Sequence, residues 1–191
     1  MHILKKFTDQ FEDIPKESLD SFIQLASKQE FKKNEFVTNF NEIPTNFYII
    51  KSGIVRSYYV EDNGKEYTRS FFIDNNPTGS LKSLLLKAPS KLAYECLTDA
   101  TLYKVKYYDF LKLTKEDIGL ANLHSRFLES VFLLMESEIY SLAMLNATER
   151  YLKLKKEILD IENIIAQYHI AAYLNISAVQ LSRIRKKLYS K

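Results

Sequence analysis

The chain has 191 residues, a formal net charge of +3, 46% hydrophobic residues and 27% charged residues. This composition can bury a core, and no apolar run approaches the roughly 20 residues that span a bilayer, so no membrane association is expected. The charged N-terminus lacks a signal-peptide core and the single cysteine, Cys96, excludes an internal disulfide; both features predict a cytoplasmic protein. The three histidines are scattered, so no metal, cofactor or catalytic site is expected.

The first predicted element is a helix over about residues 7–28, in which Leu19, Phe22 and Ile23 recur at helical spacing. Short β-rich runs broken by turn signals follow at residues 35–39, 47–51, 53–60, 67–73, 92–97 and 101–106. Asn63-Gly64 predicts a tight hairpin between the third and fourth of these runs, because both residues tolerate positive φ angles. Many short strands at this spacing predict a β-roll or jelly roll.

From about Tyr108 the pattern is helical to the end of the chain. An alternating three-four step selects seven residues, five of them apolar: His124, Leu128, Val131, Met135, Glu138, Leu142 and Leu145. Other apolar residues widen this stripe, so the helix can pack on its own domain and on a partner at once. We favour a homodimer helix over one buried within a single subunit, with Glu138 as the residue that fits a dimer seam least well.

Charge is unevenly distributed along the chain. Residues 146–191 hold nine basic and four acidic residues, whereas residues 1–145 hold 18 basic and 20 acidic ones. Arg150, Lys153 and Lys156 share one face of a helix that opens at Thr148. A basic region on a near-neutral body predicts a polyanion partner, and a merely solvated helix face is the alternative that charge alone leaves open.

Residues 167–188 have the pattern of a helix-turn-helix. Asn175 stands where the first helix must end and tolerates the left-handed conformation, and the Ser177 hydroxyl can cap the second helix. The apolar residues that would be buried are Ile170, Ala171, Leu174, Leu181, Ile184 and Leu188. The outer face of the second helix is then polar and basic, as a helix that reads DNA requires: Gln180, Arg183, Arg185, Lys186 and Lys187.

Three stretches carry a family resemblance: residues 47–56, 142–150 and 167–188. They resemble the Crp/Fnr family of bacterial regulators, in the short-tailed form of Bacteroidetes-like sequences, and the match covers nearly the whole chain. Residues 47–56 are similar to an early hairpin of the family's cyclic-nucleotide-binding β-roll. The resemblance implies an α+β fold with a sensor roll over residues 1–117, a dimerisation helix over 118–145 and a helix-turn-helix domain over 146–191.

The resemblance also implies a function and a DNA-binding site. A regulator of this kind binds double-stranded DNA as a homodimer on a roughly palindromic operator, and RNA polymerase is a further expected partner. The family's DNA-contacting positions fall on Ser177, Ala178, Val179, Gln180 and Arg183. Ala178 and Val179 replace residues that are often polar in the family, and their side chains can still contact thymine methyl groups.

The residues that hold a cyclic nucleotide in this family are changed. The family's Gly-Glu pair corresponds to Gly79-Ser80, its phosphate-binding arginine to the region of Lys91, and its adenine-contacting pair to Met135 and Glu136. Serine lacks the carboxylate and lysine the bidentate fork, so no response to cyclic AMP is expected. The candidate effector pocket, for an unknown small molecule or none, is Gly79, Ser80, Lys91 and Met135. Only three residues follow Leu188, so the wing of the family is expected to be absent or reduced.

Two other classes of function are alternatives to a DNA-binding regulator. An enzyme on a β-roll scaffold would need clustered acid, base or metal-ligand groups, and the sequence shows no such cluster and no phosphate loop. A module that acts through protein partners, with a helix-turn-helix that no longer reads DNA, is the alternative to a regulator, because Ala178 and Val179 leave room for it.

Overall fold

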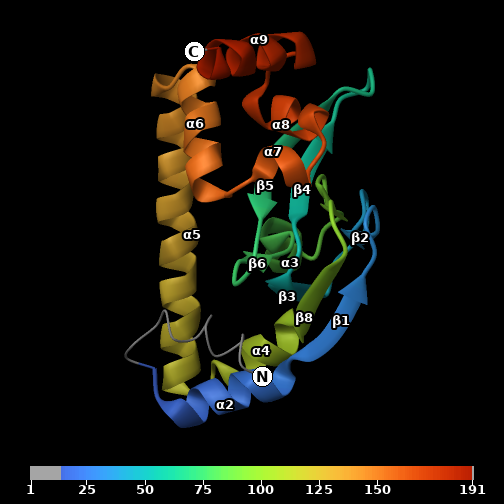
Figure 1. Ribbon diagram of the computed structural model, residues 1–191. Helices are drawn as coiled ribbons and strands as arrows, with labels where there is room; N and C mark the ends of the chain where they lie inside the picture. Colours follow the sequence, from blue (N-terminus) through green and yellow to red (C-terminus); the bar gives the residue numbers. More distant parts are fainter. Residues whose placement is uncertain (1–13, 191) are drawn as a thin grey trace.

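A computed structural model describes residues 14–190, in which a β-roll lies beside one long helix and short helices cover one end (Figure 1). The roll region contains α2 (Lys16–Leu25), β1 (Ser27–Phe31), β2 (Phe36–Thr38), β3 (Asn46–Ser52), β4 (Val55–Val60), β5 (Glu66–Phe72), β6 (Pro77–Thr78), α3 (Leu81–Leu86), β7 (Ala93–Cys96), β8 (Ala100–Lys106) and α4 (Tyr107–Leu113). The helical region contains α5 (Ile118–Met144), α6 (Ala147–Glu157), α7 (Ile161–Ile164), α8 (Gln167–Leu174) and α9 (Ala178–Tyr189). The predicted α+β class, with a roll, a long helix and C-terminal helices, is confirmed.

The roll consists of two four-stranded antiparallel sheets. Their strand orders are β1-β8-β3-β6 and β2-β7-β4-β5. The inner faces enclose a core that includes Ile50, Val55, Tyr94, Cys96 and Leu102, all at most 1% exposed. Alternate residues of each strand point inward, so short β-rich runs are enough to fill this core. All six expected strands are present, with ends shifted by one or two residues.

The N-terminal helix is shorter than the sequence predicts. Residues 7–13 lie outside the described residues, and α2 ends at Leu25 rather than at Lys28. Residues Ser27–Phe31 instead pair with β8, from Ser27 opposite Lys104 to Phe31 opposite Ala100. The paired residues lie 69 to 77 positions apart in the sequence, and a local periodicity cannot reveal such a pairing. The short elements β6 and α3 were also not predicted.

The stretch 47–56 is not a hairpin, contrary to the expectation from the resemblance. Its first strand, β3, pairs with β8 and β6, whereas β4 pairs with β5 and β7, so the chain crosses from one sheet to the other at Gly53. Gly53 has a φ of 101°, and a Cβ there would lie 2.7 Å from the carbonyl oxygen of Asp99. Only glycine fits this crossing.

The hairpin predicted at Asn63-Gly64 joins β4 and β5, but its turn is not the tight one expected. Gly64 alone of the two adopts a positive φ, at 82°. The Glu61 amide donates to the Lys65 carbonyl, and the Asn63 side chain accepts from the Lys65 amide, so the loop is wider than two residues. The Asn63 side chain therefore stabilises the turn by a local hydrogen bond instead of by a left-handed backbone.

Helix α5 runs along one side of the molecule (Figure 1). It has two apolar faces. Its first turns pack Leu120 and Leu123 against Phe22 in a second core. A separate stripe at helical spacing is between 37% and 63% exposed: Leu128, Phe132, Met135, Ile139 and Leu142. No helix in the described part of the chain is long and apolar enough to cross a membrane.

The predicted dimer seam mixes these two faces. His124 packs on Phe110 of its own subunit, with ring centroids 5.5 Å apart, and Glu138 pairs with Lys153 of α6. Both residues therefore belong to the face that contacts the same chain, and Glu138 does not interrupt the outward stripe. The predicted step repeats every 3.5 residues on average, whereas a straight helix has about 3.6 residues per turn. Over three heptads the selected positions therefore drift around the helix, and they include residues of both faces.

The C-terminal helices have a core of their own and also pack on the roll. Tyr151, Ile161 and Leu174 are fully buried in this core. Ile54 and Leu97, at the end of the roll, belong to the same cluster.

Candidate nucleic-acid interface

Helices α8 and α9 form the predicted helix-turn-helix. Asn175 ends α8 in the left-handed conformation, with φ 52° and ψ 46°. The Ser177 hydroxyl accepts a hydrogen bond from the Gln180 amide at 3.2 Å, and the Gln180 side chain accepts one from the Ser177 amide at 2.9 Å. This reciprocal capping box satisfies donors that the first turn of α9 would otherwise leave unpaired. Both local predictions are confirmed.

The packing of the two helices also agrees with the sequence. In α8, Ile170, Ala171 and Leu174 are at most 4% exposed, and in α9 Leu181 is fully buried. Ile184 and Leu188 are partly buried against the same core. The apolar stripe of α9 therefore faces the protein, which determines that its opposite side faces outward.

The outward side of α9 is polar and cationic at the end of the molecule (Figure 1). Among the predicted DNA-binding residues, the exposed ones are Ser177, Ala178, Val179, Gln180, Arg183, Lys186 and Lys187. In the described part of the chain no ion pair involves Arg183, Lys186 or Lys187. Three unpaired cations on one exposed helix are available to phosphate groups.

Arg185 differs from the other predicted DNA-binding residues. Its Nε lies 3.0 Å from a carboxylate oxygen of Glu162 in α7, and its side chain is 27% exposed. The same carboxylate pairs with Lys155. Arg185 therefore holds α9 on α7, and its charge is largely neutralised where it stands.

The three basic residues predicted to share a face of α6 also differ in whether they have partners within the protein. Arg150 donates to the carbonyl oxygen of Leu174 at 2.9 Å, and Lys153 is turned towards α5. Lys156 alone of the three is exposed. Much of the positive charge of residues 146–191 thus holds helices together, and the free cations are concentrated on α9.

Ser182 is a further exposed residue on the outer side of α9, in addition to those predicted from the sequence. It lies one helical turn from Ala178 and one from Lys186, so the three share a side of the helix. The signal was available in the i, i+4 spacing, and a serine hydroxyl can donate to or accept from a base edge or a phosphate.

The four residues of the candidate effector pocket have different surroundings. The Ser80 hydroxyl donates to Ser83 at 2.9 Å and accepts from Ser90 at 3.0 Å in a buried network. Lys91 is exposed, and Met135 is 48% exposed on the outward stripe of α5. Gly79 lies close to Phe47, since a Cβ there would be 3.4 Å from the Phe47 Cα.

Two surface hollows lie away from these four residues. One of about 270 Å³ is next to α2 and Lys104, and one of about 370 Å³ lies between the β4–β5 turn and the helix-turn-helix, where Lys65, Tyr168 and Ala178 line it. Neither is lined by Gly79, Ser80, Lys91 or Met135.

Comparison with known proteins identifies the roll. Residues 28–117 match the family described as the cyclic nucleotide-binding domain. The roll is therefore similar to cyclic nucleotide-binding domains. No curated protein matches the chain at the level of sequence.

Solved structures extend the likeness beyond the roll to most of the chain. FixK2 from Bradyrhizobium japonicum is 20% identical, with a TM-score of 0.75 over 86% of this chain and 85% of that one. A Eubacterium rectale protein described as a transcriptional regulator of the Crp/Fnr family is 20% identical, with a TM-score of 0.71 over 95% and 87%. The c-di-GMP-responsive regulator CLP from Xanthomonas campestris is 15% identical, with a TM-score of 0.66 over 92% of each chain. The resemblance to Crp/Fnr regulators is thereby confirmed in domain type and in fold.

Proposed function

We propose that this protein is a transcription regulator that binds double-stranded DNA as a homodimer, with α9 of each subunit in a major groove. The observation that carries the proposal is the exposed, unpaired cationic side of α9, led by Arg183, Lys186 and Lys187. An arginine at this place can form two hydrogen bonds to a guanine, and the lysines near the helix end can contact phosphates. In this proposal residues 1–117 are the sensor, 118–145 the dimer helix and 146–191 the reader.

The exposed stripe of α5 supports the homodimer. Phe132, Ile139 and Leu142 are each more than 60% exposed, and together with Leu128 and Met135 they form a continuous apolar strip. A monomer rarely leaves such a strip in water, and a second copy of the same helix can cover it by two-fold symmetry. Two readers related in this way meet two half-sites about 34 Å apart on the DNA, which is why a roughly palindromic operator is proposed.

We further propose that the regulator does not respond to cyclic AMP. The residue at the place of the family's carboxylate is Ser80, whose hydroxyl bonds two other serines and carries no charge. Any effector is an unknown small molecule of another kind. RNA polymerase is proposed as a partner because a regulator bound near a promoter acts on it.

The first experiment selects bound sequences from a random DNA pool and then measures affinity for the enriched site by fluorescence anisotropy. Arg183→Ala is expected to weaken binding by about 1–3 kcal/mol and to relax base preference, because a fork to one base is lost. Lys187→Ala is expected to weaken binding on all sequences and to lower the salt dependence by about one phosphate contact. Lys115→Ala, in the loop after α4, is the matched control. Unchanged binding by both reader variants would refute the proposal.

A second candidate is a module that binds protein partners through the same helices. Val179, at the start of α9, is apolar and 61% exposed, which favours a protein contact more than a phosphate contact. Such a module would show no DNA affinity at low ionic strength and an interaction that salt does not weaken.

A further inference from the structure

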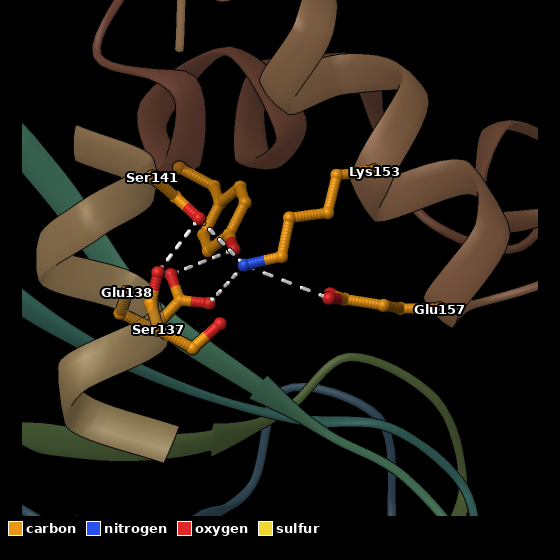
Figure 2. Close-up of polar contacts among 6 residues, drawn as sticks. Ser137, Glu138, Ser141, Lys153 and Glu157 are labelled. Carbon is orange, nitrogen blue, oxygen red and sulfur yellow. Dashed lines mark hydrogen bonds and ion pairs between the residues drawn. The ribbon is translucent and has the colours of Figure 1, made fainter. Parts of the chain in front are cut away.

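Lys153 of α6 connects this helix to α5 (Figure 2). Its ammonium group lies 2.9 Å from Glu138 and donates to the Ser141 hydroxyl at 2.7 Å, both on α5. Glu157, one turn further along α6, lies 3.8 Å from the same nitrogen. The three donors of the ammonium group thus each have an oxygen to face.

The local geometry explains why Lys153 reaches α5. Only Leu145 and Asn146 separate α5 from α6, and the Asn146 side chain accepts hydrogen bonds from two amides of the first turn of α6. The chain therefore folds back, and α6 runs beside the last turns of α5 (Figure 1). The ammonium group then lies near the C-terminal end of α5, where the helix dipole favours a cation.

Glu138 also extends the network to the helix-turn-helix. The Tyr173 hydroxyl of α8 donates to its second carboxylate oxygen at 3.3 Å. The Tyr173 ring packs on Phe71 of the roll, with centroids 5.3 Å apart. Among the described residues, every side-chain hydrogen bond or ion pair between α5 and the helices that follow it passes through Glu138 or Ser141.

We propose that Glu138, Lys153 and Tyr173 form a clasp that sets the angle of the reader to the dimer helix. The inference rests on the proposed function, and the three are positioning residues, because Lys153 and Glu138 face each other between α5 and α6 and not the outer side of α9. A dimer binds a two-half-site operator strongly only when both readers reach their half-sites at once. A single half-site binds only one reader, so its affinity does not depend on the angle between the reader and the dimer helix.

The test compares Lys153→Met with Lys156→Met on two duplexes, one with both half-sites and one with a single half-site. Lys156 is an exposed lysine three residues further along α6, so its variant removes the same charge from the same helix. Lys153→Met is expected to weaken binding to the full operator about tenfold, and to the single half-site by less than about twofold, because only the joint contact is lost. Lys153→Arg keeps the ion pair and is expected to recover most of the affinity.

Three results would overturn the clasp: equal losses on both duplexes, no loss on either, or the same loss from Lys156→Met. A wild-type protein that binds neither duplex would instead refute the proposed function, and a structural measurement then tests the clasp.

Spin labels at Glu129→Cys on α5 and Lys187→Cys on α9 give the distance between the two helices. The labelled subunits are diluted in unlabelled protein, and the native Cys96 is buried. Lys153→Met is expected to broaden this distance distribution, and an unchanged distribution contradicts the proposal.

Discussion

His169 is a buried titratable residue at the junction of α8 and the roll. It is 5% exposed, and its Nδ1 has no hydrogen-bond partner among the described atoms. Burial, together with the positive charges of Arg56 and Lys33, lowers its pKa to about 4. The imidazole is therefore neutral in the folded protein at any pH above this value.

The pKa of His169 predicts a loss of stability in mild acid. Between pH 6.5 and about 4 the unfolded chain binds a proton at this residue and the folded chain does not, so the free energy of unfolding falls as the pH falls, by on the order of 3 kcal/mol at most. In urea titrations across this range, His169→Gln is expected to show a shallower pH dependence. Burial also lowers the pKa of His124, so some dependence remains in the variant. An identical slope in both proteins would show that His169 does not titrate as proposed.

Ser177 gives a second prediction at the scale of single residues. Its side chain caps α9, so Ser177→Ala is expected to destabilise the protein by about 1 kcal/mol in chemical denaturation. Ser177→Thr retains a hydroxyl and serves as the control. Equal stability of Ser177→Ala and the wild type would mean that solvent satisfies the Gln180 amide equally well.

Among the elements, α5 is the one whose environment is incomplete in a single chain. Its own-subunit face carries Leu120, Leu123 and Glu138, while the stripe from Leu128 to Leu142 has no partner in the described residues. The separation of these faces lets one helix support the roll, contact the C-terminal helices and leave a face for the proposed second subunit.

A charge on this stripe is expected to break the proposed dimer. Phe132→Glu places a carboxylate in the middle of the apolar strip, where a dimer would bury it without a cation. Sedimentation equilibrium should then show a shift to monomers, together with weaker binding to a two-half-site operator. Ser130→Glu, exposed and away from the stripe, should leave the mass unchanged. A dimeric Phe132→Glu variant would place the interface elsewhere.

At the scale of the whole molecule, the helix-turn-helix is packed on the β-roll as well as joined to it by α5. Ile54 and Leu97 from the roll enter the core that Tyr151 and Leu174 form, and Phe71 contacts Tyr173. The outer end of the roll therefore touches the helix-turn-helix directly, which gives the roll a physical route to bias the position of the proposed DNA-binding helices.

This shared packing predicts cooperative unfolding. Ile54→Ala removes buried methyl groups at the junction and is expected to cost about 2–4 kcal/mol in stability. Hydrogen exchange should show protection lost in α8 as well as in β4. Ile43→Ala, an exposed loop residue, is the control. If α8 kept its protection while β4 lost it, the two parts would unfold independently.

The helix-turn-helix was predictable because its determinants are local. The Asn175 bend, the Ser177 cap and the stripe of Ile170, Leu174 and Leu181 all act within a few residues of one another. The strands of the roll were predictable for the same reason. Their partners were not, since β3 and β4 lie next to each other in the chain but in different sheets.

The sequence by itself determined the kinds of element, their order and the polar outer side of α9, because propensity, capping and periodicity depend on near neighbours. The tertiary structure alone decided which cations are free and which side of α5 is exposed. Arg185 and Lys153 find carboxylates that lie 23 and 15 residues away, and only folding brings those groups within reach. A charge is therefore visible in a sequence, but its partner is a property of the fold.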